Sequence, residues 1–343
     1  MNQDDIKQIC KLFNIEYVPS SRKYWLVRTN SGIFFDDFYE NGYISIGWDE
    51  FSDIEQLQDE KEEKLKEKIS QTYINEKKPG YILNQIKRFV FDLKKGDMVL
   101  IPSENSSLIA FGIITDTIYI KNVISSPINI KNPKCPYKKR INVKWIRIMN
   151  KKQFEPYLRM LLFTHTTISN IDEYMNYINR TLYPIYLYKD ELHLTYKVQT
   201  TNDIPFAHFS KFLNIISDSL NLFDNITGSN FKNDKLDIKT SLNSPGIIEI
   251  IGYITGAGLV LSFINSFLFG GKFDINLMKG LNFSQEHNGL LGYILKFKME
   301  ENKNNQEIAK IKNEYEIQKE ALKLKAPNEK DNENNNENDK GSK

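Results

Sequence analysis

Cysteine and histidine are scarce in this chain of 343 residues, and their scarcity excludes several kinds of site. The two cysteines, Cys10 and Cys135, are too few for a disulfide framework or a cysteine-rich zinc site, which favours a reducing compartment. None of the four histidines has metal-motif spacing, and His193 is expected to be half-exposed in an alternating strand. We therefore predict no metal or other cofactor and a cytoplasmic protein.

Several sequence motifs of enzymes and secreted proteins are also missing. "GGKFD" lacks the spacing and the hydroxyl residue of a phosphate-binding loop, and "DELHLTYK" lacks the spacing of a restriction-type nuclease. The N-terminus "MNQDDIKQICKLF" has no apolar core of a signal peptide. The adjacent carboxylates Asp36-Asp37 and Asp49-Glu50 are more typical of turns than of acid–base catalysis. The sequence does not support an enzyme, and it leaves the question open.

The overall charge is small, so any contact with nucleic acid must come from a local patch. The formal net charge is +2, with 26% charged and 40% hydrophobic residues. This composition is that of an ordinary globular protein, and the length predicts two or three domains.

Hydrophobic periodicity and turn residues predict an α+β protein with five parts. The first domain mixes strands and helices with few β-α-β alternations, and the second resembles a small α/β unit. The C-terminal helix or short coiled coil has an apolar face formed by Ile308, Ile311, Tyr315 and Leu322. The predicted parts are an N-terminal helix at 1–19, a first domain at 20–183, a small α/β domain at 184–300, this helix at 301–326 and a disordered tail at 327–343.

The most apolar segment, residues 250–271, carries no charge. About 20 such residues can cross a bilayer as a helix, yet the segment contains Thr255, Asn265 and several glycines. A membrane span, with contact to the inner membrane, and a buried helix of the second domain are both consistent with this pattern.

Aromatic and basic residues are interleaved in two places. The stretch "YISIGWDEF" ends a strand and then places Trp48 directly after Gly47, where the ring can serve either as core or as a stacking surface. A second cluster surrounds Trp145 with Lys134, Lys138, Lys139, Arg140, Lys144 and Arg147. Rings can stack on bases and cations can hold phosphates, so both places are candidates for binding nucleic acid.

Four ordered motifs over about residues 20–180 resemble the N-terminal domain of Mrr-type restriction enzymes and related defence proteins. They are "YWLVRTNSGIFFDDFYENGYISIGW", "QIKRFVFDLKKGDMVLIP", "FGIITD" and "RINVKWIRIMNKKQFEPYLRMLLFTHTTISNI". That family is similar to the PUA/EVE group of small β-barrels with flanking helices. The resemblance implies recognition of nucleic acid, in some members of a modified base, and it points to Trp25, Arg28, Asp37, Phe38, Trp48 and Trp145. Gly47, Gly96 and Asp97 match the motifs as well, and they are interpreted as turn-formers.

The sequence thus predicts a non-catalytic sensor of DNA, RNA or a modified nucleotide in an anti-phage or restriction-like defence system. Its candidate binding residues are Trp25, Arg28, Asp37, Phe38, Trp48, Lys138, Lys139, Arg140 and Trp145. No nuclease motif follows the first domain, unlike in the restriction enzymes. The alternative is a membrane-associated effector or scaffold whose N-terminal domain binds a protein or nucleotide signal. A homo-oligomer fits either hypothesis.

Overall fold

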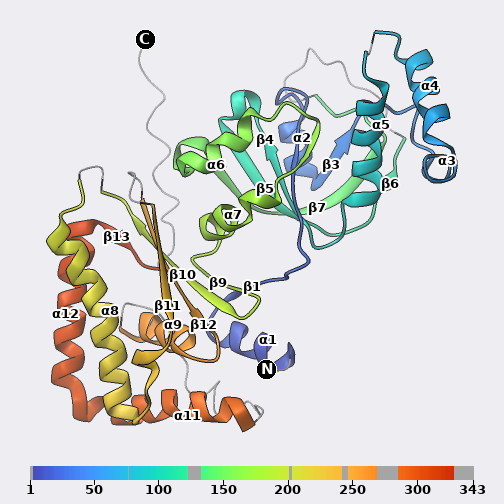
Figure 1. The fold of residues 1–343 in the computed structure, drawn as a ribbon. Helices are drawn as coiled ribbons and strands as arrows, with labels where there is room; N and C mark the ends of the chain where they lie inside the picture. The colour runs from blue at the N-terminus through green and yellow to red at the C-terminus, as the bar shows by residue number, and fades with distance from the viewer. Residues whose placement is uncertain are drawn as a thin grey trace. The chain divides into compact units, whose positions relative to one another are not determined.

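The computed structural model describes residues 3–75, 77–122, 133–200, 203–241, 246–268 and 285–327, and the chain divides into two compact units (Figure 1). The barrel unit spans Ser21–Ile178, and the terminal unit combines Met1–Ser20 with Asn179–Lys343. The N-terminal segment belongs to the terminal unit because β1 (Glu16–Val18) pairs in parallel with β9 (Ile185–Tyr188).

The barrel unit is built on a curled half-barrel sheet with the strand order β3-β7-β5-β4-β2-β8, and β6 also pairs with β7. The long strand β7 pairs with β3 and β6 over its first residues and with β5 over its last ones, so the sheet curls around it. Strands β2 and β4 are parallel neighbours. The strands are β2 (Tyr24–Val27), β3 (Tyr43–Ile46), β4 (Met98–Pro102), β5 (Leu108–Ile114), β6 (Tyr119–Ile120), β7 (Lys139–Asn150) and β8 (Ile168–Asn170). The mixed α+β class predicted from the sequence is confirmed.

Helices flank this sheet, as the sequence predicts. Asp53 begins α3 by accepting a hydrogen bond from the Gln56 amide, and the charged run that follows forms α3 and α4. The helices are α2 (Phe35–Asn41), α3 (Ile54–Asp59), α4 (Glu62–Thr72), α5 (Pro79–Lys87) and α6 (Pro156–Met160), with a π-helical turn η1 (Arg88–Asp92) and 3-10 turns η2 (Glu104–Ser106), η3 (Lys151–Gln153), η4 (Leu161–Phe163) and η5 (Asp172–Tyr174). Helix α7 (Met175–Leu182) contains the boundary between the two units.

Two hydrophobic clusters of the barrel unit position the candidate residues. One lies between the sheet and α2 and includes Val27, Phe38 and Ile141. The other lies among α3, α4 and α5 and includes Leu57 and Ile86. The half-buried side chain of Trp48 packs against both of them.

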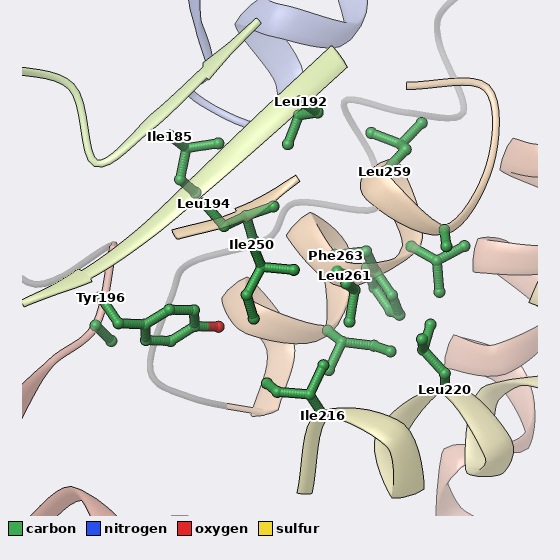
Figure 2. Packing of buried hydrophobic residues seen from close by; sticks show 14 of the residues in the cluster. Ile185, Leu192, Leu194, Tyr196, Ile216, Leu220, Ile250, Leu259, Leu261 and Phe263 are labelled. Atoms are coloured by element: carbon green, nitrogen blue, oxygen red, sulfur yellow. The ribbon is translucent and has the colours of Figure 1, made fainter. Parts of the chain in front are cut away.

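The terminal unit has a sheet with the strand order β1-β9-β10-β12-β11, and β13 pairs with β10. Its core fills the space between this sheet and the helices, where Leu194, Ile250, Ile216 and Phe263 converge (Figure 2). The remaining strands are β10 (Glu191–Val198), β11 (Leu236–Ser241), β12 (Gly246–Tyr253) and β13 (Leu324–Lys325). The helices are α1 (Gln3–Leu12), α8 (Phe206–Thr227), α9 (Ala257–Leu268), α11 (Gln285–Glu300) and α12 (Asn305–Leu322), with 3-10 turns η6 (Phe231–Asn233) and η7 (Glu301–Asn304).

The prediction of one apolar helix at 250–271 is wrong. The segment begins inside β12, a central strand that is buried on both faces and rich in β-branched isoleucine. The chain then turns at Gly256, where a Cβ would lie 2.2 Å from Asp234 Oδ2, and enters α9, whose Ala257 amide donates to that carboxylate. In the described residues no helix combines the length and apolar character needed to cross a membrane, and residues 269–271 lie outside them.

The predicted C-terminal helix corresponds to α12, which packs against α8. Its predicted apolar face is buried, because Ile308, Ile311, Tyr315 and Leu322 all lie in the core of the terminal unit. The predicted disordered tail lies outside the described residues from position 328 onward.

Candidate nucleic-acid interface

The nine candidate residues all lie in the barrel unit, but they do not form one binding surface. Five of them are buried, namely Trp25, Asp37, Phe38, Lys139 and Arg140. Arg28, Trp48 and Trp145 are half-buried, and Lys138 is exposed.

Trp25 and Asp97 hold a turn against the sheet. The indole Nε1 of Trp25 donates to Asp97 Oδ2 at 3.0 Å, and the backbone amides of Lys23 and Lys94 donate to the same carboxylate. The Trp25 ring is buried in the cluster between the sheet and α2. Both motif residues therefore stabilise the join between β2 and the turn that precedes β4.

Asp37 and Arg140 belong to a buried polar network around Tyr43. Asp37 accepts hydrogen bonds from the Tyr43 hydroxyl and from the Cys135 amide at 2.8 Å. The Arg140 guanidinium lies 4.0 Å from the centroid of the Tyr43 ring and donates to the Cys135 carbonyl oxygen at 2.9 Å. Burial, reinforced by the hydrogen bond to Asp37, raises the pKa of the Tyr43 hydroxyl. These contacts fasten β3 to β7 and to the segment before β7.

Lys139 is fully buried and makes internal contacts. Its Nζ donates to the Trp48 carbonyl oxygen at 2.8 Å and lies 3.7 Å from Asp49 Oδ1. Burial lowers the pKa of Lys139 to about 8, although Asp49 and Glu50 act in the opposite direction. The side chain that the sequence suggested for phosphate binding instead stabilises the turn after β3.

That turn has an unusual backbone, because Trp48 has a φ of +58°. Bulky residues rarely adopt this left-handed conformation, which costs of order 1–3 kcal/mol. The hydrogen bond from Lys139 and the packing of the indole between two hydrophobic clusters offset that cost. The Tyr137 ring packs close to Gly47, because a Cβ on Gly47 would lie only 3.3 Å from that ring. Trp48 thus connects the half-barrel to the helices α3, α4 and α5.

The second half of β7 presents a different surface. On one side of β7, β3 pairs only with residues 139–142, and no described strand pairs with residues 144–150 on that side. This open edge carries Trp145, with the exposed side chains of Lys144, Ile146 and Ile148 as neighbours.

Two aromatic rings are fixed at this open edge. Trp145 Nε1 donates to the Phe38 carbonyl oxygen at 3.0 Å, and its six-membered ring lies against Gly112, where a Cβ would be 2.6 Å from it. Tyr39, which is 36% exposed, has its ring centroid 6.0 Å from that of Trp145 at 33°. On its other side Tyr39 stacks on Phe35 at 6.2 Å. Trp145 also packs against the cluster between the sheet and α2, and both rings remain partly open to solvent.

Basic residues predominate in the chain segment around β7, whereas α2, which carries Tyr39, also exposes Asp36 and Glu40. Residues 133–159 contain nine lysines and arginines, and their single acidic residue, Glu155, is buried. Lys139 and Arg140 are also buried, and Arg147 is half-buried. The exposed basic residues of this segment are Lys134, Lys138, Lys144, Lys151, Lys152 and Arg159. Together with Tyr39 and Trp145 they are called the β7 surface below.

A small pocket lies at the carboxyl ends of the parallel strands β2 and β4. Its volume is about 210 Å³, and Thr29 Oγ1 joins the two strand ends by donating to the Pro102 carbonyl oxygen at 2.5 Å. Lys151 reaches the pocket's rim from the end of β7, since its Nζ donates to the Asn105 carbonyl oxygen at 3.1 Å. The residues that line the pocket are Arg28, Thr29, Ser31, Gly32, Pro102, Ser103, Asn105 and Ser106.

The terminal unit contains a buried polar cluster that the sequence did not indicate. Glu249 accepts hydrogen bonds from Tyr186 at 2.9 Å and Arg180 at 3.4 Å, and His193 Nδ1 lies 2.9 Å from its Oε1. Burial raises the pKa of Glu249, but His193, Arg180 and Tyr186 outweigh this and lower it overall. His193 is 3% exposed rather than half-exposed, because Glu249 and Tyr186 pack around it in the middle of the sheet. The described residues contain no group of three or more histidine, cysteine or acidic side chains placed to hold a metal ion.

Comparison with protein families gives a match to the barrel unit. A family model for a domain of unknown function (DUF8426) matches residues 23–172, nearly the whole of the barrel unit. No curated protein matches the sequence.

Proposed function

We propose that the barrel unit binds nucleic acid through the β7 surface. The observation that carries this proposal is the open edge of β7, where the partly exposed rings of Trp145 and Tyr39 lie and Lys144 is exposed, in a segment rich in basic residues. Basic side chains attract the phosphate backbone, and exposed rings provide stacking faces for unpaired bases. The net charge of the whole chain is too small to do this, so the local clustering is what matters.

The proposal includes the type of domain suggested by the four motifs. A curled half-barrel with flanking helices is consistent with a PUA/EVE-like module, as is the position of Trp25 and Asp97 where β2 meets the turn before β4. In this proposal the module senses nucleic acid, with or without a modified base, as part of a defence system. Trp48 is then a packing residue at the base of the module, and Trp145 is the stacking residue.

Binding of the full chain to labelled oligonucleotides tests the proposal. Single-stranded and duplex DNA and RNA, with and without modified bases, are titrated at two salt concentrations by fluorescence anisotropy. We expect salt-dependent binding, tightest for single strands, that falls steeply when Lys138, Lys144, Lys151 and Lys152 are all changed to Gln. The matched control changes Lys61, Lys77, Lys94 and Lys95 to Gln, which are exposed residues of the same unit. Failure of the folded chain to bind any of these oligonucleotides would contradict the proposal, as would an equal loss in both quadruple variants.

A further inference from the structure

We infer that the pocket at the carboxyl ends of β2 and β4 binds a phosphate monoester, such as the terminal phosphate of a nucleic-acid strand. This inference rests on the proposed function, and it names the group that the barrel unit recognises beside the β7 surface. Four observations carry it, namely the chemistry of the lining, the unpaired charge of Arg28, the shape of the two loops and the position of Lys151.

The lining of the pocket suits an anion better than a base. Its lining residues are Arg28, Asn105, four hydroxyl residues, Gly32 and Pro102, and none of them is acidic or aromatic. Hydroxyl, amide and guanidinium groups donate hydrogen bonds to phosphate oxygens, whereas an extruded base needs flat apolar or aromatic walls. The volume of about 210 Å³ is below the roughly 300–1,000 Å³ of sites for drug-sized ligands, so it fits a small group.

Arg28 supplies a charge that the protein leaves unpaired. Its Nη2 donates to the carbonyl oxygens of Leu162, at 2.6 Å, and Thr164. In the described part of the chain it makes no ion pair with a carboxylate. Burial without such a partner lowers the pKa of Arg28, which nevertheless stays charged at neutral pH. A phosphate in the pocket would supply the missing negative charge, and a planar guanidinium suits its oxygens.

Backbone geometry explains why the pocket has this shape. Asn30, Ser31 and Gly32 follow β2 in left-handed conformations, and Asn105 and Ser106 do the same after β4. A Cβ on Gly32 would lie 2.1 Å from the backbone nitrogen of Glu104, so the two loops approach at backbone distance. This approach closes one wall of the pocket and leaves the side chains of Ser31 and Ser106 on its lining.

Lys151 links the pocket to the β7 surface. Besides the bond from its Nζ to Asn105, its backbone amide donates to the Ser107 carbonyl oxygen at 3.0 Å. The exposed basic segment after β7 therefore begins at the rim of the pocket. A strand lying along the β7 surface would reach the pocket with its terminal group, and Lys151 would add a second positive charge there.

The test compares end groups on one short single-stranded oligonucleotide, using the full chain and fluorescence anisotropy at fixed salt. The probes carry a 5′-phosphate, a 3′-phosphate or hydroxyls at both ends. Inorganic phosphate and a nucleoside monophosphate, with the neutral nucleoside as control, are titrated separately by calorimetry. We expect a phosphorylated end to tighten binding about ten- to a hundredfold, the range of charge-assisted hydrogen bonds. R28Q should abolish this preference, so that phosphorylated and hydroxyl-ended probes bind this variant equally.

Because Arg28 also contacts Leu162 and Thr164, S31A provides a second variant whose side chain has no hydrogen-bond partner in the described structure. S31A should reduce the preference severalfold, and R28K should retain part of it. Oligonucleotide binding with no preference for a phosphorylated end would overturn the pocket assignment and leave the proposed function standing. Binding of phosphate or the monophosphate, lost in R28Q, without any oligonucleotide binding would support the pocket and overturn the proposed function. Absence of all binding would overturn both.

Discussion

The two halves of β7 carry similar sequences and have opposite surroundings. In the first half, Lys139 and Arg140 are buried and their donors satisfy carbonyl oxygens of the protein. In the second half, Lys144 is exposed and Trp145 is half-exposed at an open edge. The difference comes from β3, which pairs only with residues 139–142 and begins opposite Asn142. The basic residues of β7 therefore have two different roles in the structure. Lys139 and Arg140 make internal contacts, whereas Lys144 lies on the surface.

The open edge of β7 has a second interpretation. Lysines on an exposed strand edge protect a protein from edge-to-edge aggregation without binding anything. Protection does not require aromatic rings fixed in a half-exposed position, as Trp145 is by its bond to Phe38. Internal contacts, protection of the edge and binding of a ligand by these residues predict different effects of substitution.

Reversing the charge of the buried Lys139 should have the largest effect on stability. Lys139→Glu would place a carboxylate in a buried site beside Asp49 and near Glu50, where it repels both and loses the bond to the Trp48 carbonyl oxygen. We expect a loss of about 3–5 kcal/mol in the free energy of unfolding, measured by urea denaturation. Lys144→Glu at the exposed edge is the control and should change stability by no more than about 0.5 kcal/mol. Equal losses for the two variants would show that the halves of β7 do not differ as described.

The pH dependence of stability should reveal the buried ammonium group of Lys139. Its pKa of about 8 in the folded protein is lower than the ordinary value near 10.5, so between these values the unfolded chain binds more protons than the folded one. Stability contributed through Lys139 should therefore rise as the pH increases from 8 to 10.5, by about 3 kcal/mol at most. Below pH 8 the lysine is charged in both states, and its burial costs stability in full.

Lys139→Met is the reference for this measurement, because it keeps the length of the side chain and removes the titrating group. The difference in free energy of unfolding between wild type and this variant cancels the other groups that titrate in the same range. We expect the difference to move in favour of wild type across pH 8–10.5. A constant difference would contradict the burial of a charged Lys139.

Removing the ring at the open edge should weaken binding without unfolding the protein. Trp145→Ala deletes one stacking face, and loss of one base stack costs about 1–3 kcal/mol, or roughly 5- to 150-fold in affinity for a single strand. Trp145→Phe keeps a ring and should retain most of the affinity. Anisotropy gives the affinity, and circular dichroism shows that each variant is folded. If Trp145→Ala binds as tightly as wild type, the ring is a packing residue and not a stacking surface.

Much of the fold could be predicted from local patterns, because the main strands of the barrel unit are short apolar runs between turn residues. β4 follows the turn at Gly96 and Asp97, and β7 contains the motif "RINVKWIRIMN". The apolar segment at 250–271 was misinterpreted because composition does not separate a membrane helix from a central strand followed by a buried helix. Gly252 and Gly258 are the sequence signal of this strand-to-helix arrangement. Their backbones pack directly on each other, because a Cβ on either glycine would lie 2.4–3.0 Å from backbone atoms of the other.

The candidate residues were harder to assign, because their surroundings depend on contacts distant in sequence. Lys139 and Lys144 look alike in sequence, and only the extent of β3, nearly a hundred residues earlier, distinguishes them. Trp48 and Trp145 also look alike in the sequence, because each is an aromatic residue next to strand-forming residues. The left-handed backbone of Trp48 directs its ring between two clusters, whereas a bulge in the pairing of β5 with β7 accompanies the half-exposed position of Trp145.

Single neutralisations on the β7 surface should have the smallest effect, and the most specific one. Changing Lys138, Lys144 or Lys152 to Gln one at a time should lower affinity only a few-fold, because each removes at most one phosphate contact. Each should also reduce the slope of log affinity against log salt concentration by about 1, for any oligonucleotide sequence. Lys139→Met should leave the slope unchanged because that ammonium group is buried. If these lysines only protect the edge, changing them to Gln would also leave the slope unchanged. The change would instead promote aggregation. The salt slope therefore distinguishes a binding surface from a protected edge. A slope that changes in Lys139→Met but not in Lys144→Gln would reverse the roles assigned to the two halves of β7.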